Sequence, residues 1–192
     1  MLVSARGVRI TERGAVIGGI EYEVDCIVYA SGFEYGTDYT RRAGFDMAGR
    51  NGVTLSKAWA NGMRTLHGMH VHGFPNLFVV QLAQGAFLGS NVPHGFAESA
   101  QTIAAVVRHA VAHDAREVEV TEEAQNTWVD MLLRDGIPFG AADCTPGYYN
   151  NEGQEAGLAE RLSVGYPLGA TAFFSLIDGW RASGQFEGLT FR

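Results

Sequence analysis

Hydrophobic and polar residues alternate near the amino end of the chain. Val8 and Ile10 are separated by a polar residue, Arg13-Gly14 has turn chemistry, and further apolar positions follow up to Val24. An alternation with a period of two is typical of strands with one buried face, so this segment predicts a β-hairpin. Asp25–Gly32 is instead a continuous apolar run that ends in small residues. Such a run predicts a strand buried on both faces, as in a parallel sheet covered by helices.

The middle of the chain predicts loops and two more strands. Phe33–Gly62 is rich in glycine and polar residues, with one helical turn expected near Ser56–Ala60. Strands are predicted at Leu66–Val71 and at Leu77–Leu82, which would be buried. Gly73–Asn76 lies between them and has the composition of a tight turn.

Three helices are predicted in the second half of the chain, where apolar residues recur at steps of three and four. The first runs from about Val92 to His113, the second follows Thr121 and ends at Gly136, and the third covers about Thr171–Ala182. The expected apolar face of the first helix consists of Phe96, Ala100, Ile103, Val107 and Ala110.

The order of these elements predicts an α/β fold. A strand at Leu77–Leu82, a glycine-containing loop and a long helix form the βα unit of a nucleotide-binding domain. Other strands that would complete such a sheet are missing, so we expect an incomplete Rossmann-like fold with a helical tail. Residues 1–113 would form the nucleotide-binding region, and residues 114–192 a helical extension packed on it.

Composition narrows the classes of function. The 192 residues carry a formal net charge of −7 without a cluster of Lys and Arg, which argues against a nucleic-acid partner. No apolar stretch is long enough to span a bilayer, so we expect no membrane association. Cys26 and Cys144 are too few for a disulfide framework and favour a cytoplasmic location.

Three closely spaced histidines raise the question of a metal site. His70 and His72 would project to the same face of a strand, and His67 lies nearby. Imidazoles are common metal ligands, but no carboxylate nearby completes a ligand set. We expect a hydrogen-bonded group near a domain junction and no metal.

Several segments resemble, in order, the characteristic sequences of one family. Asp25–Phe33 is similar to a strand of that family in which an acidic residue is followed, after four other residues, by Ala-Thr-Gly-Phe. Ser31 stands where threonine is usual. Gly73–Phe78 is the most recognisable run, Ser90-Asn91 closes a loop, and Thr145–Gly153 is similar to the tail of one subgroup. Smaller matches are Gly52-Val53-Thr54-Leu55, Trp59, Gly62, Arg64-Thr65 and Gly68. The chain thus resembles the carboxyl-terminal portion of the Baeyer–Villiger monooxygenases, a group of flavin-containing monooxygenases.

The resemblance implies the last part of a flavoprotein with two dinucleotide-binding domains. Such an enzyme binds FAD, is reduced by NADPH, and inserts oxygen beside a ketone carbonyl to give an ester or lactone. The glycine fingerprints that bind both dinucleotides do not occur in this sequence. We therefore expect the chain alone to hold FAD weakly and not to turn over, and we assign no catalytic residue.

The resemblance also implies which residues contact the cofactor and the substrate. A helix start presents free amides and a partial positive charge, so it favours the negative charge of a reduced flavin. Ser90 or Asn91 can cap the predicted long helix at such a start, although a capped helix after a loop is also ordinary in α/β proteins.

The expected cofactor-binding residues are Ala30, Ser31, Gly32, Gln84, Gly89, Ser90, Asn91 and Val92. The expected wall of the ketone pocket is Ala86, Phe87 and Leu88. Leu82-Ala83 stand where the family has Gly-Pro, which weakens the expected flavin contact there.

A second hypothesis is a non-catalytic module. A strand such as Asp25–Ala30, without sequence neighbours to cover it, would leave apolar surface exposed. The chain would then form a homo-oligomer through that surface, or pair with a missing partner half.

Overall fold

The computed structural model describes residues 7–29, 39–138 and 157–192. By its internal contacts the chain divides into two compact units, residues 1–36 and residues 37–192. The predicted boundary near residue 113 lies inside the second unit and stays a prediction. In the described residues, no helix combines the length and apolar character that crossing a membrane requires.

The first unit is a small antiparallel sheet. Strands β1 (Val8–Ile10), β2 (Gly14–Ile17) and β3 (Ile20–Glu23) pair in that order. The predicted hairpin is confirmed between β1 and β2, and a third strand extends it. Gly18 and Gly19, with φ of 59° and 83°, make the second turn in a region that favours glycine.

The predicted buried strand at Asp25–Gly32 is wrong over its described part. Residues 25–29 form no strand, and Val28 is 83% exposed. A continuous apolar strand needs neighbours on its edges and cover on its faces, and no described strand pairs with this segment. Ala30, Ser31 and Gly32 lie outside the described residues.

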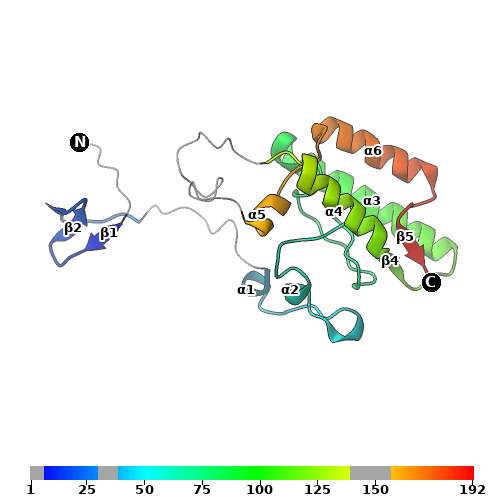
Figure 1. The fold of residues 1–192 in the computed structure, drawn as a ribbon, viewed down its shortest axis with the longest axis horizontal. Helices are drawn as coiled ribbons and strands as arrows, with labels where there is room; N and C mark the ends of the chain where they lie inside the picture. The colour runs from blue at the N-terminus through cyan, green and yellow to red at the C-terminus, as the bar shows by residue number, and fades with distance from the viewer. Residues whose placement is uncertain (1–6, 30–38, 139–156) are drawn as a thin grey trace. The chain divides into compact units, whose positions relative to one another are not determined.

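The second unit is mainly helical, with one two-stranded sheet (Figure 1). Its strands β4 (Val118–Val120) and β5 (Leu189–Phe191) are antiparallel. Helix α6 packs along α3. The helices are α1 (Tyr39–Ala43), η1 (Arg50–Gly52), α2 (Leu55–Ala58), η2 (Phe87–Gly89), α3 (Val92–Ala112), α4 (Glu122–Asp135), α5 (Leu158–Leu162) and α6 (Gly169–Ser183). The combination of helices and strands confirms the α/β class in its coarse form.

The three predicted long helices and their ends are confirmed. The side chain of Asn91 accepts a hydrogen bond from the His94 N–H at the start of α3, and Thr121 caps α4 in the same way through Ala124. Gly136 follows α4, and Gly184 ends α6 with a left-handed φ of 66°. Local cap chemistry therefore marks where α3 and α4 begin and where α6 ends.

The buried face of α3 differs from the predicted one. Phe96 and Val107 belong to the predicted face but are 40% and 43% exposed. The helix buries Ala110 as predicted, together with Gly95, Thr102 and Val106, which lie outside the predicted face. The prediction is wrong because α3 carries apolar residues on two adjoining faces, and periodicity does not tell which face meets the rest of the unit.

The two strands predicted at Leu66–Val71 and Leu77–Leu82 are also wrong. Isolated bridges replace them, one between Leu66 and His70 and one between His70 and Phe78. His67 has a φ of 56° and Gly68 a φ of 73°, so the chain turns back on itself where a strand would continue. The predicted turn after Val71 is present, and Asn76 within it bonds the backbone of β4.

The core of the second unit is built around Trp128. Its ring stacks on Tyr166 at 5.5 Å between centroids and contacts Phe173 from α6. Leu132 and Ile177 are buried in the same cluster. Each large apolar side chain buried in this way stabilises the fold by about 1.5–3 kcal/mol. This cluster supports the loop of residues 81–91, where the predicted site lies.

Candidate functional site

The described site residues lie in one continuous segment, the loop of residues 81–86, η2 and the start of α3. Gln84, Ala86 and Phe87 are buried, whereas Gly89 and Asn91 are exposed. Leu88 lies within η2, and Val92 is the first residue of α3. The structure thus brings the predicted pocket residues next to the predicted helix start.

Gln84 is the central structural element of this loop. Its Oε1 accepts hydrogen bonds from the N–H and the hydroxyl of Thr65, at 3.1 and 2.6 Å. Its Nε2 donates to the carbonyls of Met63 and Leu162, at 2.6 and 3.1 Å. The side-chain amide therefore has its bonds satisfied inside the protein.

The backbone of the loop is fixed as well. The Gln84 N–H donates to the Val164 carbonyl at 2.6 Å, and the Gln84 carbonyl accepts from Trp128 Nε1 at 3.1 Å. The Tyr166 N–H donates to the Gly85 carbonyl. These bonds hold the loop in one position, which a preorganised cofactor site requires. A Gln in a glycine-containing loop carries no sequence signal for this role.

The start of α3 offers fewer free amides than a typical helix start. Pro93 has no N–H, and the N–H of His94 is bonded to Asn91. Val92 supplies the remaining amide of the first turn. The structure therefore supports contact between an anion and a single backbone N–H, that of Val92, rather than contact with several N–H groups at once.

Ser90 brings a second polar group to this helix start. Its hydroxyl oxygen is buried and has no hydrogen-bond partner. A buried hydroxyl without a partner costs about 1–3 kcal/mol. Among the predicted cofactor residues that the structure describes, Ser90 is the one with a buried side-chain atom that lacks a hydrogen-bond partner.

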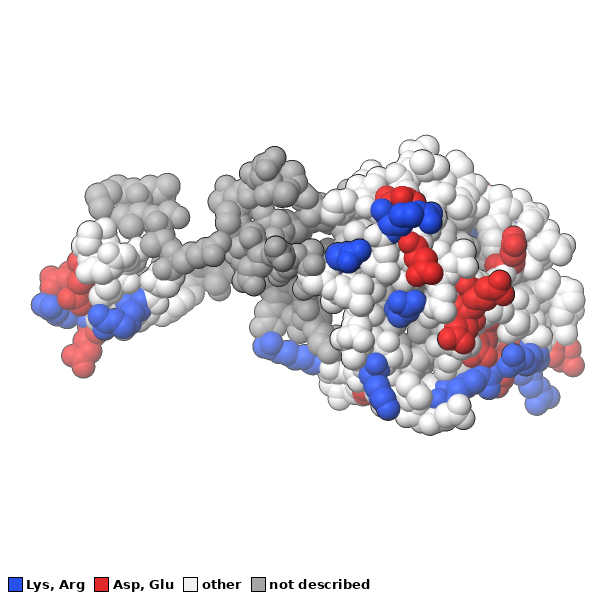
Figure 2. All heavy atoms as spheres, in the orientation of Figure 1, with Lys and Arg blue, Asp and Glu red and all other residues white. Residues whose placement is uncertain are grey.

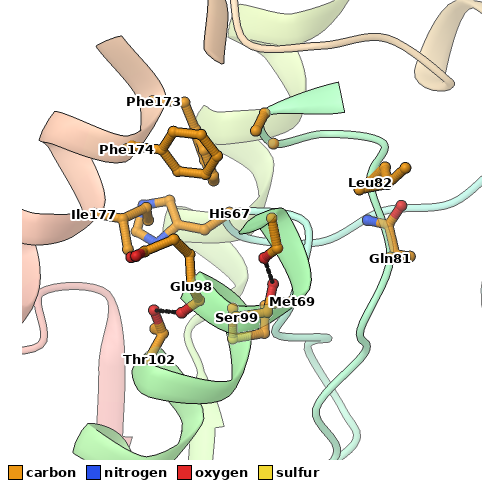
Figure 3. Close-up of a pocket in the computed structure, with 13 residues that line it drawn as sticks. His67, Met69, Gln81, Leu82, Glu98, Ser99, Thr102, Phe173, Phe174 and Ile177 are labelled. Carbon is orange, nitrogen blue, oxygen red and sulfur yellow. Dashed lines mark hydrogen bonds between the residues drawn. The ribbon is translucent and has the colours of Figure 1, made fainter. Parts of the chain in front are cut away.

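A small cavity lies behind the loop, between α3 and α6 (Figure 3). His67, Phe173 and Ile177 contribute to its lining, while the hydroxyls of Ser99 and Thr102 bond back to carbonyls of α3. Its volume is about 20 Å³. A water molecule fits such a volume, but a flavin ring or a ketone does not.

His67 and His70 belong to the aromatic core, whereas His72 Nδ1 lies 3.0 Å from the Val120 carbonyl oxygen. His67 packs edge-on against Trp128 and Trp180, with centroids 4.7 and 5.2 Å apart, and His70 packs against Phe78. Burial lowers the pKa of His67 to about 3, with a further contribution from His70, and lowers the pKa of His70 to about 4. Within the described part of the chain, no three His, Cys, Asp or Glu side chains gather closely enough to hold a metal ion.

The surface charge is mixed. On the face of the second unit that shows α4, acidic and basic side chains are interspersed (Figure 2). Arg50, for example, pairs with Glu117 at 2.6 Å and with Glu119 at 2.9 Å. This distribution offers no extended basic surface on that face.

The structure is similar to solved protein structures over nearly the whole chain. Its structure is similar to the polycyclic ketone monooxygenase from Thermothelomyces thermophila, with a TM-score of 0.77 and 28% identity over 97% of this chain and 31% of that protein. A steroid monooxygenase bound to NADP has a similar fold, with a TM-score of 0.73 and 24% identity over 95% of this chain and 32% of that protein. No family model matches the sequence.

Curated relatives are closer in sequence. Pentalenolactone D synthase of Streptomyces arenae is 40% identical over 190 residues, 96% of this chain and 32% of that protein. The FAD-binding monooxygenase hmp7 of Hypomyces subiculosus is 40% identical over 94% of this chain and 30% of its own length. A Baeyer–Villiger monooxygenase of Streptomyces coelicolor is 41% identical over 185 residues, 94% of this chain and 30% of that protein.

The chain is therefore a homologue of the Baeyer–Villiger and related FAD-binding monooxygenases, and the predicted family is confirmed. It spans about a third of the length of the curated relatives it matches.

Proposed function

We propose that the chain is the carboxyl-terminal portion of an FAD- and NADPH-dependent monooxygenase that inserts oxygen into ketones. The observation that carries this proposal is the 38–41% identity to several monooxygenases over nearly the whole chain. The name of the Thermothelomyces enzyme gives a polycyclic ketone as its substrate. A ketone is accordingly the substrate class we propose.

In that enzyme, FAD would supply the group at which oxygen is activated, and NADPH its reducing equivalents. Of the described residues, the Ser90 hydroxyl and the Val92 amide fit a cofactor contact best, because both lie at the start of α3 and have bonding capacity left. Ala86, Phe87 and Leu88 would form apolar wall, held in place by the bonds of Gln84. Ala30, Ser31, Gly32, Gly89 and Asn91 remain proposed contacts from the family resemblance.

The isolated chain would lack activity. Its sequence has no dinucleotide fingerprint, and the cavity behind the loop, at about 20 Å³, is too small for a flavin. Purified chain should therefore be colourless and should not oxidise NADPH in the presence of a ketone. Bound flavin at a one-to-one ratio after gel filtration would contradict this part of the proposal.

A chimera tests the proposed function of the intact enzyme. The 185 residues of the Streptomyces coelicolor monooxygenase that match this chain are replaced by the chain itself. We expect the chimera to bind FAD and to oxidise NADPH in a ketone-dependent reaction that yields an ester or lactone. The same enzyme without the replaced segment is the negative control. A folded, FAD-loaded chimera that oxygenates no ketone would contradict the proposal.

A second candidate function is the non-catalytic module that pairs with itself or with a missing half. Exposed apolar side chains on α3, among them Val111 at 73%, favour it. Self-pairing predicts a dimer in gel filtration with light scattering, at concentrations where the first candidate predicts a monomer.

A further inference from the structure

Two histidines stand one helical turn apart at the carboxyl end of α3. His109 lies in the last turn of the helix, and His113 is its C-cap residue. A spacing of four residues places two side chains on the same side of a helix. The two imidazole rings stack, with centroids 4.1 Å apart and 27° between the ring planes. The fold thus brings two potential metal ligands together, away from the candidate cofactor site.

The ring of His113 is held in one tautomer by the backbone. Its Nδ1 lies 2.8 Å from the carbonyl oxygen of His109. A carbonyl oxygen only accepts hydrogen bonds, so Nδ1 of the neutral ring carries the proton and Nε2 keeps its lone pair. Histidines that bind metals commonly donate their other ring N–H to a carbonyl in this way. His113 is exposed, so a cation in solution can reach the ring.

The ring of His109 is positioned by two phenylalanines. Its centroid lies 4.9 Å from that of Phe186 and 4.6 Å from that of Phe191. Among the described residues, no hydrogen bond occupies the ring nitrogens of His109. Because packing already limits the movement of this ring, a bound cation would cost little additional side-chain entropy.

The separation of the rings suits one cation shared by both. Bonds from an imidazole nitrogen to Zn²⁺ are about 2.0–2.1 Å long, so two nitrogens on one ion lie within about 4 Å of each other. Rings with centroids 4.1 Å apart reach this limit after a small rotation. The carboxyl end of a helix also carries partial negative charge, and the chain has a net charge of −7. Both charges favour a cation at this position.

We propose that His109 and His113 bind one divalent transition-metal cation, with water in the remaining coordination positions. Imidazoles suit Cu²⁺, Ni²⁺ and Zn²⁺, with Cu²⁺ the tightest, whereas Mg²⁺ and Ca²⁺ prefer oxygen ligands. In the described part of the chain no third His, Cys, Asp or Glu completes the ligand set. The ion is therefore exchangeable, unlike that of a four-ligand structural zinc centre. The site lies at the other end of α3 from Ser90 and is independent of the proposed function.

The other four histidines of the chain offer no such pair. His67 and His70 are buried in the aromatic core. His72 is half-buried, and His94 is exposed, with its ring against Phe174. Each of these two would supply a single imidazole, which holds a cation less tightly than two linked imidazoles. His94, an exposed histidine on the same helix, is therefore the matched control.

Calorimetric titration of the untagged chain with Cu²⁺ tests the proposal. Cys26 and Cys144 are first replaced by serine, because thiolates would compete for the ion. We expect one Cu²⁺ per chain in this parent and in its His94→Gln variant. His109→Gln and His113→Gln should each weaken the affinity at least about tenfold, because one of two linked ligands is lost.

Two further measurements separate ligand loss from loss of structure. Circular dichroism establishes that each variant is folded, and the exposed His113 keeps the test valid if His109→Gln does not fold. Electron paramagnetic resonance of the Cu²⁺-loaded parent should show coupling to two imidazole nitrogens, and that of His113→Gln to no more than one. Zn²⁺ should compete with Cu²⁺, and an excess of Mg²⁺ should not.

The outcomes decide between this pair and other ligands. Loss of affinity in His113→Gln, with affinity retained in His94→Gln, supports the site whether or not the chimera oxygenates ketones. A folded His113→Gln chain that binds Cu²⁺ as tightly as the parent overturns the proposal. Equal loss in His94→Gln, or one ion for every two chains, assigns the ion to other ligands or to a bridge between copies and also overturns it.

Discussion

Arg181 on α6 and Glu98 on α3 form an ion pair with 2.7 Å between Nη2 and Oε2, and their side chains are only 14% and 16% exposed. The guanidinium also bonds the Glu98 carbonyl and the Thr102 hydroxyl, each at 3.2 Å, and pairs with Asp178. This cluster fastens α6 to the inner face of α3, so it fixes which face of α3 is left outside.

Replacing Arg181 should loosen that attachment. Arg181→Met leaves the Glu98 carboxylate partly buried without its cation and should cost about 2 kcal/mol of unfolding free energy. Urea unfolding followed by circular dichroism measures the change. Arg134→Met is the control, because the Arg134–Asp135 pair is exposed at 71% and 46% and should contribute less than about 1 kcal/mol. Equal effects of the two variants would show that the α3–α6 pair has no special role.

Gln84 should be far less tolerant of substitution than its position in a loop suggests. Gln84→Ala leaves the Thr65 N–H and the carbonyls of Met63 and Leu162 buried without partners, so we expect a loss of about 3 kcal/mol or more. Gln101→Ala, an exposed position on α3, should change stability by less than about 0.5 kcal/mol. Unfolding of both variants in urea tests the structural role directly, and a Gln84→Ala chain as stable as wild type would refute it.

The sequence predicts those parts of the fold that local chemistry determines. The caps at Asn91 and Thr121 and the glycine after α6 can be read directly, and the helices they delimit are found. The strand predicted at Leu66–Val71 fails because His67 adopts a left-handed conformation that composition does not signal. The described part of the strand predicted at Asp25–Gly32 fails because a buried strand depends on pairing partners that the described residues do not supply.

The place of the candidate site stays a prediction, and the structure differs from the expectation in the role of one residue. The loop before α3 and the helix start lie together as expected, and Ser90 has an unused hydroxyl there. The side chain of Gln84, expected at the cofactor, is committed to Thr65 and to two carbonyls far along the sequence. Such long-range bonds depend on the tertiary fold, which a local pattern cannot report.

The buried histidines predict a stability that falls in mild acid. The pKa of His67, about 3, and that of His70, about 4, lie below the ordinary value of 6.5 because burial disfavours the charged ring. The unfolded chain therefore binds protons first, and stability is full above about pH 6.5 and lost as pH falls toward 4. Each histidine contributes a slope of about 1.4 kcal/mol per pH unit.

A variant at one buried histidine and a variant at a residue that does not titrate test this dependence. His70→Phe should remove about half of the slope between pH 6.5 and 5, whereas Gln101→Ala, at an exposed position, should leave it unchanged. Urea unfolding at several pH values gives the slopes. A His70→Phe chain with the wild-type slope would contradict the assignment.

Ser90 and Asn91 should respond differently although they are neighbours. Asn91→Ala removes the cap of α3 and should cost about 1 kcal/mol of stability. Ser90→Ala removes a buried hydroxyl without a partner, so the isolated chain should be as stable as wild type or more so. In the chimera, Ser90→Ala should weaken FAD binding, measured by flavin release on dilution. A Ser90→Ala chimera that holds FAD as tightly as the parent chimera would remove Ser90 from the site.

The central claim, that this chain completes a ketone-oxygenating enzyme, is tested most directly by oxygen isotope incorporation in the chimera. With NADPH, a cyclic ketone and ¹⁸O₂, we predict a lactone that carries one atom of ¹⁸O by mass spectrometry. A folded, FAD-loaded chimera that consumes NADPH and yields no labelled lactone would contradict the claim.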